Sequence, residues 1–509
     1  MNIKDYIVPF LFALATAWLL QRFVINRWFA PNISGSKDPA TFMASQSAQA
    51  SKPLNTEVDF FDNEKITPTK TTQIETEWGI VTFSTQAASL ERVVLKRIID
   101  GEKQLLTILT PPNENEKEQR CFLVAFQENT PYYYTLEEQQ NTDDSTVLIY
   151  QAQSDYGIVR KIFTVHNKVH QIDLNLSIDP KKSIESRIFF AEPHMQEVVS
   201  DVVSAIVIDE ANVFTKQNKN SLPINQGWLK PTLFGSDTRY MIHAMIDDAN
   251  VFAQRAYYKH SENKIFSVLE NESISKPTEW KLSFYLGPKE ADAVAAVDDR
   301  LEQTFEYSGY LAPISRILIK ILNFLYKYVH NYGFAIILLT VFIKLLLLPF
   351  TIKSEAGMKQ RTEMQKKLQY LQKKYKNEPD ILARERAELI RKHGMPGLGG
   401  CLPLLLQIPI FFALSRILAN SIELYHAPML WIPDLSASDP YYILPIGVTL
   451  AMLAQAAISD SQQRMSVVAM AFVFGAFTTS FSAGLALYIF VSTLLGVLQT
   501  QLVKSLKIA

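Results

Sequence analysis

Lys344 has the most unusual setting in this sequence, because it is a cation inside a long apolar run. The run, residues 332–350, is long enough to cross a bilayer as a helix. A lysine there costs about 2.5–3.5 kcal/mol, so intramembrane cations generally serve a function. Thr340 lies four residues earlier on the same helical face, which makes a polar stripe. Snorkelling is the alternative, since the run ends about 9 Å from Lys344 along a helix axis.

Neutral polar side chains also occur in the apolar runs that follow along the chain. They include Gln407, Ser415, Gln455, Thr478, Thr479, Ser492, Thr493 and Gln499. Each of them alone is typical of a contact between membrane helices. Together with Lys344 they predict one wet, positively charged groove. Such a groove would lower the cost of drawing a polar or acidic stretch of another chain into the bilayer.

Several kinds of chemistry have no candidate residues in this chain. No Asp or Glu lies in the middle of an apolar run, whereas proton-coupled transporters and intramembrane aspartyl proteases need buried carboxylates. The sequence has no His-Glu-x-x-His motif, no Walker loop and no Gly-x-Ser-x-Gly elbow. Cys121 and Cys401 fall in different halves, so we expect neither a disulfide nor a metal site. The groove therefore predicts work on a substrate without a covalent reaction, with no enzyme activity and no cofactor.

Six apolar runs must position these side chains. The first run, within residues 1–30, has bulky residues where a signal-peptide cleavage site needs small ones, so it favours an uncleaved signal-anchor over a cleaved signal peptide. The others make residues 331–509 a five-span core. Their approximate bounds are 332–350, 402–421, 441–458, 466–481 and 484–503.

The remaining chain divides into soluble and interfacial parts. Residues 31–57 are rich in Ser, Ala, Gln, Pro and Thr, which predicts a flexible linker. Residues 58–300 alternate with period two and predict a mostly β domain, a sandwich large enough to hold its own core. Residues 309–330 form an amphipathic helix directly before a span, which favours a place in the membrane interface. Its predicted apolar face consists of Ile314, Ile317, Leu318, Ile321, Leu322 and Leu325. A helix of the soluble domain is the alternative.

Residues 351–400 are strongly basic, with twelve Lys and Arg against six Asp and Glu. The positive-inside rule places this segment in the cytoplasm, and the alternation of spans then puts the β domain outside and both termini inside. Helix-forming residues on either side of Asn377–Asp380 predict a helical hairpin. Its function is either contact with anionic lipid alone or docking of a polypeptide or ribosome. The candidate docking residues are Lys366, Lys367, Lys373, Lys374, Arg384 and Arg386.

Four stretches of the sequence match a known family in order and topology. They are Thr340–Lys344 with Leu348-Pro-Phe350, Gly399–Ile410, Leu435–Pro445 and Ser482–Tyr488. With these stretches the chain resembles the YidC-type membrane protein insertases, in their Gram-negative form with a large periplasmic domain. The resemblance covers essentially the whole length. It implies a multi-pass α-helical membrane protein with six spans, five of them forming the insertase core, and a supersandwich-like periplasmic β domain.

The resemblance also implies a function and a site. The function is that of an insertase and chaperone of the bacterial inner membrane, acting alone or with the Sec translocon on nascent membrane proteins. It places substrate contacts on Thr340 and Tyr488, in a groove with Gln407, and puts Lys344 where the family typically has arginine. Lysine keeps the charge and loses the forked geometry of arginine. The chain ends without a long basic tail, which weakens the expectation of ribosome docking; anionic lipids are expected partners and nucleic acid is not.

Two other functions compete with this interpretation. A solute transporter or channel with an extracytoplasmic binding domain is disfavoured by the missing intramembrane acids and by the lack of a visible repeat among the spans. A structural scaffold whose β domain recruits periplasmic partners is the third hypothesis.

Overall fold

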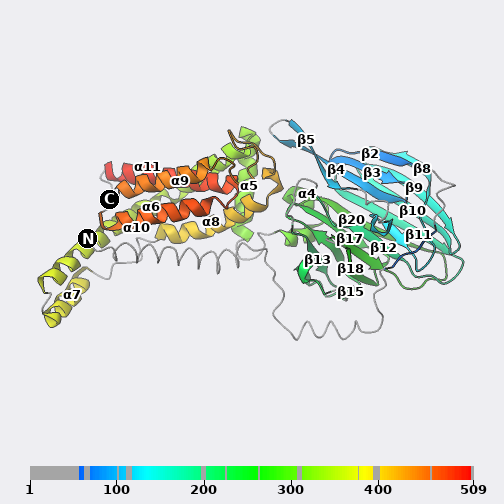
Figure 1. The fold of residues 1–509 in the computed structure, drawn as a ribbon, viewed down its shortest axis with the longest axis horizontal. Coiled ribbons are helices and arrows are strands. Elements are labelled where there is room, and N and C mark those ends of the chain that lie inside the picture. The colour runs from blue at the N-terminus through cyan, green and yellow to red at the C-terminus, as the bar shows by residue number, and fades with distance from the viewer. Residues whose placement is uncertain are drawn as a thin grey trace. The chain divides into compact units, whose positions relative to one another are not determined.

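The structure is a computed structural model that describes most of the chain. The described ranges are 57–61, 69–99, 102–110, 117–195, 202–223, 226–261, 264–305, 312–375, 378–393, 402–458 and 461–505. The expected signal-anchor, nearly all of the expected linker and Cys401 lie outside these ranges, as does the side chain of Lys366. The chain divides near Ser308 into two compact units (Figure 1). We call described residues 57–305 the β unit and described residues 312–505 the helical unit.

The β unit contains the strands that the period-two pattern predicted. Their bounds are β1 Phe60–Phe61, β2 Thr71–Glu75, β3 Gly79–Ser84, β4 Ser89–Ile99, β5 Glu102–Leu109, β6 Leu123–Ala125, β7 Thr130–Pro131, β8 Thr135–Asn141, β9 Ser145–Ser154, β10 Gly157–His166, β11 Gln171–Pro180, β12 Arg187–Ala191, β13 Ser204–Ile208, β14 Phe214–Asn218, β15 Gly227–Leu229, β16 Leu233–Asp237, β17 Met241–Asp248, β18 Arg255–Ser261, β19 Lys264–Glu270 and β20 Thr278–Pro288. β10 and β11 alternate between buried and more exposed side chains, as half-buried antiparallel strands do, whereas β13 and β16 are buried throughout.

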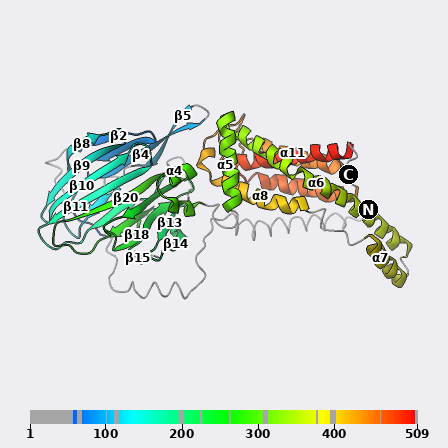
Figure 2. The same cartoon turned by 180° about the vertical axis from the view of Figure 1, so that it is seen from behind.

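These strands build a sandwich of β-sheets. A nine-stranded sheet has the order β14-β13-β16-β17-β20-β11-β10-β9-β8. A five-stranded sheet, β15-β18-β19-β12-β6, packs on it, and the Tyr258 hydroxyl donates across the interface to the carbonyl of Gly235 at 2.6 Å. A four-stranded sheet, β2-β3-β4-β5, packs on it as well, with the rings of Phe83 and Phe163 4.7 Å apart. Figure 2 shows the sheets from behind.

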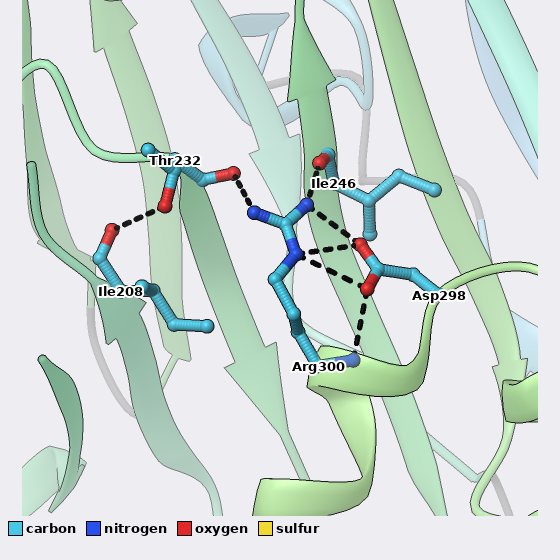
Figure 3. Close-up of polar contacts among 5 residues, drawn as sticks. All are labelled: Ile208, Thr232, Ile246, Asp298 and Arg300. Atoms are coloured by element: carbon cyan, nitrogen blue, oxygen red, sulfur yellow. Dashed lines mark hydrogen bonds and ion pairs between the residues drawn. The ribbon is translucent and has the colours of Figure 1, made fainter. Parts of the chain in front are cut away.

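The C-terminal segment of the β unit, residues 291–305, is fastened to the nine-stranded sheet. It contains the short helix α4, Ala291–Ala295, and a 3-10 turn, Asp299–Thr304. The Arg300 guanidinium pairs with Asp298 and donates to the carbonyls of Thr232 and Ile246 (Figure 3). The segment also buries Val294, Leu301 and Phe305 against the sheet. Polar and apolar contacts together therefore fix the place where the chain leaves this unit.

The helical unit consists of seven named helices. They are α5 Ala312–Val329, α6 Tyr332–Lys374, α7 Pro379–His393, α8 Leu402–Asn420, α9 Ile443–Ile458, α10 Ser461–Thr478 and α11 Ala483–Ser505. α6, α8, α9, α10 and α11 run alongside one another, and α5 lies across this bundle in both views. α6 is a single uninterrupted helix of 43 residues, longer than the predicted span, because it continues beyond Pro349 toward α7.

Each of the five predicted spans of the core coincides with a helix of this unit. Two helical stretches, Tyr332–Ile352 and Ala483–Leu502, are long and apolar enough to cross a membrane. The apolar stretches Ile443–Ile458 and Val467–Thr478 are shorter. The structure therefore has a large β-rich domain followed by apolar helices.

α5 packs against α6 and α8 through one side. The buried residues of that side are Ser315, Leu318, Ile319 and Leu322. The sequence pattern had placed Ile317 on the apolar face, but its side chain is 59% exposed, together with Phe324 and Tyr328. α5 thus has a second apolar surface that faces away from the bundle, which a helix in a membrane interface would present to lipid.

Candidate functional site

Lys344 points toward a neighbouring helix of the bundle. Its side chain is half-buried, and its Nζ lies 4.0 Å from the point where a Cβ on Gly496 would stand. Gly496 belongs to α11, which packs against α6. Among the residues that the structure describes, Lys344 has neither an ion pair nor a hydrogen-bond acceptor. The ammonium therefore lies beside α11.

Gln407 and Tyr488 meet between α8 and α11. The Gln407 Nε2 amide donates to the Tyr488 hydroxyl at 2.5 Å, across 81 residues of sequence. Ser492, one helical turn after Tyr488, also hydrogen-bonds to that hydroxyl. Tyr488 is 2% exposed and Ser492 is 9% exposed. The structure thus brings two predicted site residues into direct contact and adds Ser492 to them.

Thr340 shares a face with Lys344 but does not present its hydroxyl to an open surface. It is 1% exposed, and its Oγ1 donates to the carbonyl of Ile336 at 2.7 Å. Thr478 and Thr493 use the same bond to the carbonyl four residues earlier. A threonine satisfied in this way adds little polarity to its surroundings. Polarity near Lys344 therefore comes mainly from α11.

α11 carries a polar stripe on the face turned toward α6 and α8. Tyr488, Ser492, Gly496 and Gln499 are spaced by four, four and three residues, which places them on one helical face. The Nε2 of Gln499 is shielded from solvent and has no hydrogen-bond partner within the described parts of the chain. Ser492 and Gln499 were among the polar side chains predicted to line a groove together with Lys344, whereas Gly496 was not singled out from the sequence. The spacing along α11 was the signal that could have united them.

Arg416 is a second cation in the apolar runs, and the sequence analysis missed it. It lies in α8, four residues before the helix ends at Asn420, and its side chain is half-buried. The Asn420 amide donates to its carbonyl at 2.9 Å. Arg416 also takes part in a further interaction, unlike Lys344. Its place near the end of the helix separates it from Lys344.

The loop between α8 and α9, residues 421–442, covers the end of the bundle where α6 and α11 begin. The Asn331 amide donates to the carbonyl of Pro428 at 3.0 Å, and the Gly484 amide donates to the carbonyl of Leu435 at 2.9 Å. The Asp439 carboxylate caps α9 by accepting from the amide of Leu444 at 2.7 Å. This end of the polar stripe is closed by packed and hydrogen-bonded chain.

The predicted docking cations lie on the far part of α6 and on α7, which contact each other. Their described side chains are exposed: Lys367, Lys373, Lys374, Arg384 and Arg386. The Lys374 ammonium lies 4.9 Å from the centre of the Tyr375 ring. Because α6 is continuous, Lys367, Lys373 and Lys374 stand on the same helix as Lys344, beyond its apolar part, whereas Arg384 and Arg386 belong to α7.

Sequence comparison decides the family of this chain. Residues 324–509 match the family model described as 60Kd inner membrane protein. The membrane protein insertase YidC of Geobacter metallireducens is 30% identical over 452 residues, which cover 84% of each chain. The chain belongs to the YidC family of membrane protein insertases. YidC of Geotalea uraniireducens is likewise 30% identical over 464 residues, covering 85% of this chain and 87% of that protein.

A solved structure described as an active YidC insertase, with the first transmembrane domain resolved, aligns with 91% of this chain and 97% of its own. The two are 18% identical, with a TM-score of 0.37. As a member of the YidC family, the chain is a membrane insertase of the inner membrane that acts in protein transport. The transporter and channel alternative is not favoured by this kinship.

Proposed function

We propose that the helical unit inserts nascent membrane proteins through a polar groove lined by Lys344, Gln407, Tyr488 and the stripe on α11, with Thr340 packed behind it. The observation that carries this proposal is Lys344 itself, a cation turned toward α11 without an acceptor in the described chain. A membrane helix tolerates such a charge where it faces a cavity or a partner. A polar or acidic client segment would supply the acceptor.

We propose a topology of six spans, with residues 1–30 as the anchor and α6, α8, α9, α10 and α11 as the core. The α6–α7 hairpin and both termini are then cytoplasmic, and the β unit and the loop 421–442 are periplasmic. Two observations support it: the basic charge of residues 351–400 and the apolar stretches of the helices. The packed loop 421–442 would close the groove on the periplasmic side, so a client enters from the cytoplasm or from lipid.

The exposed cations of the α6–α7 hairpin support a docking role. We infer that they receive a nascent chain, with anionic lipid and the Sec translocon as further partners and the ribosome as a weaker one. α6 links this site to the groove because one helix carries both. The work is a transfer of a segment between environments and needs no covalent step, so we assign no enzyme activity and no cofactor.

Reconstitution tests this function. Purified protein in liposomes should insert a small nascent membrane protein, and protease protection of its translocated tail reports the reaction. Empty liposomes measure spontaneous insertion, and a solute-flux assay on the same vesicles tests the transporter alternative. Solute flux without insertion would reject the proposal.

A further inference from the structure

The side chains of Lys344 and Gln499 are two hydrogen-bond donors near Gly496 of α11, and neither donor has an acceptor among the described residues. The Lys344 Nζ lies 4.0 Å from a Cβ built on Gly496, and Gln499 follows Gly496 by three residues on the same face of α11. Side chains of a helix lean toward its N-terminus, so Gln499 covers the turn that contains Gly496. Lys344 and Gly496 also lie at similar distances from the starts of their helices. Lys344 lies twelve residues into α6 and Gly496 thirteen residues into α11, about 18–20 Å from their starts.

The Gln499 amide is unusual because it is shielded from solvent. Its Nε2 has no partner among the described residues. The half-buried Lys344 has no acceptor among them either. A buried donor without an acceptor is unfavourable, and a buried amide donor on the same helical face as the glycine beside an ammonium suits an oxyanion. The absence of a side chain at Gly496 leaves the ammonium room against α11.

We propose that Gln499 completes a two-point carboxylate site with Lys344, and that Gly496 positions the ammonium within it. The ligand is an Asp or Glu side chain of a client segment inside the groove. A lysine alone offers a point charge, whereas an arginine offers a fork of donors that matches a carboxylate. Gln499 supplies the second donor that Lys344 lacks. This inference rests on the proposed insertase function and assigns the chemistry of one position within it.

The site favours a client carboxylate over a lipid phosphate because of its place in the bundle. Gly496 and Gln499 share their face of α11 with Tyr488 and Ser492, which are buried against neighbouring helices. The outward face of α11 is different, since Leu494, Leu498 and Leu502 are exposed there. Lipid contacts that leucine side, whereas a client in the groove contacts the polar side.

Three substitutions measure the role of Gln499 in reconstituted full-length protein. The probe is a client with zero or two Asp residues in its translocated tail. Gln499→Leu should slow insertion of the acidic tail about tenfold, as expected for one hydrogen bond to a charged group, with a smaller effect on the neutral tail. Gln499→Arg should restore the insertion rate of the acidic tail. A role of Gln499 in packing alone would not allow this recovery. Gln501→Leu, an exposed position two residues later on α11, is the matched control and should behave as the parent.

A double-substitution cycle tests the coupling between the two donors. In a Lys344→Arg background the guanidinium supplies its own second donor, so Gln499→Leu should lose most of its effect on the acidic tail. Gly496→Leu, which crowds the ammonium, should reproduce the loss for the acidic tail. Membrane integration and the protease fragments of each variant report whether it is folded.

The outcomes separate this inference from the proposed function. Equal slowing of both tails by Gln499→Leu, or an unchanged effect in the Lys344→Arg background, would overturn the two-point site while leaving insertion by the groove intact. A loss that follows the anionic-lipid content of the vesicles instead of the tail charge would assign the site to lipid phosphate and overturn it too. Failure of the unsubstituted protein to insert either tail would reject the proposed function itself.

Discussion

Each unit has a lysine that is at least half-buried, and the two lysines differ in the hydrogen-bond acceptors around them. Lys161 of the β unit is fully buried, and its Nζ donates to the carbonyls of Ala87 at 2.6 Å, Phe122 at 2.7 Å and Ala88 at 3.3 Å. Lys344 of the helical unit is half-buried and finds no acceptor within the described chain. The β unit surrounds Lys161 with its own backbone carbonyls, whereas the described residues of the helical unit provide no acceptor for Lys344.

The surroundings of Lys161 explain why it is structural. Ala87, Ala88 and Phe122 all have positive φ angles, of 56°, 39° and 64°, which non-glycine residues adopt at a cost. The Lys161 Nζ donates to the carbonyls of all three residues and also lies 4.8 Å from the centre of the Tyr134 ring. Burial lowers the pKa of Lys161 well below its usual value. The difference teaches that a buried charge indicates function when the protein does not itself supply the opposing groups.

The largest expected effect on insertion comes from removing the exposed cations of the helical unit. Replacing residues 353–392 by a Gly/Ser linker should abolish client insertion, because both the helical shape and the positive charge are removed. A control variant with Lys367, Lys373, Lys374, Arg384 and Arg386 changed to Gln keeps the helices and isolates the charge. Protease protection measures insertion, and flotation with vesicles measures lipid binding. Normal insertion by the linker variant would reduce the hairpin to a lipid anchor.

The second prediction concerns the buried lysine of the β unit. Lys161→Met should destabilise the β unit by about 3 kcal/mol or more, because it leaves buried carbonyls without donors. Lys168→Met is the matched control: Lys168 is 64% exposed, and its ion pair with Asp144 is worth little. Hydrogen exchange of the full chain in detergent measures both. If the two variants are equally stable, Lys161 is not the organising group described above.

A smaller effect should appear in acid, again in the β unit. Burial lowers the pKa of His243 to about 4, while its Nδ1 lies 3.1 Å from the carbonyl of Ala191. The unfolded chain therefore binds the proton more tightly, and stability should fall as pH drops from about 6.5 to about 4, by at most about 3 kcal/mol. His243→Gln, which keeps an N–H donor, should flatten this dependence in hydrogen exchange. His170, whose pKa burial also lowers to about 4, remains as a second source. An unchanged slope would contradict the assignment.

The smallest effect on insertion should follow removal of the β unit. Deleting residues 60–300, with the anchor and α5 retained, should leave insertion by the remaining chain close to that of the parent, because the polar stripe and the hairpin lie outside the deletion. Complementation after depletion of the native copy and insertion in liposomes both measure this. A membrane-embedded deletion variant that inserts no client would show that insertion also requires the β unit.

The sequence predicted regular elements well because each has a period. The span 332–350, the helical hairpin and the alternating strands all follow from the spacing of apolar residues. It also contained a signal for Lys161 that was not used, since the alternation in β10 places this residue on the same inward face as Val159 and Phe163. A period indicates which side of a strand or helix is buried.

Contacts between distant segments were beyond the reach of the sequence. Nothing in the pattern indicates that Thr340 bonds to its own backbone, or that Gly496 faces Lys344 across 152 residues. Those facts depend on how α6 and α11 pack, which the spacing within either helix does not specify. The exposure of Ile317 has the same origin, because α5 packs on two helices and its buried side is set by them.

The central claim is that Lys344 attracts acidic client segments, and one measurement tests it most directly. Clients whose translocated tails carry zero, one or two Asp residues are inserted by protein with Lys344, Lys344→Arg, Lys344→Ala or Lys344→Glu, and tail protection is compared. Arginine should support all three tails, alanine should be mildly impaired, and glutamate should hinder insertion progressively as Asp residues are added. If Lys344→Glu inserts all three tails as well as the parent, the lysine is only snorkelling and the electrostatic mechanism is wrong.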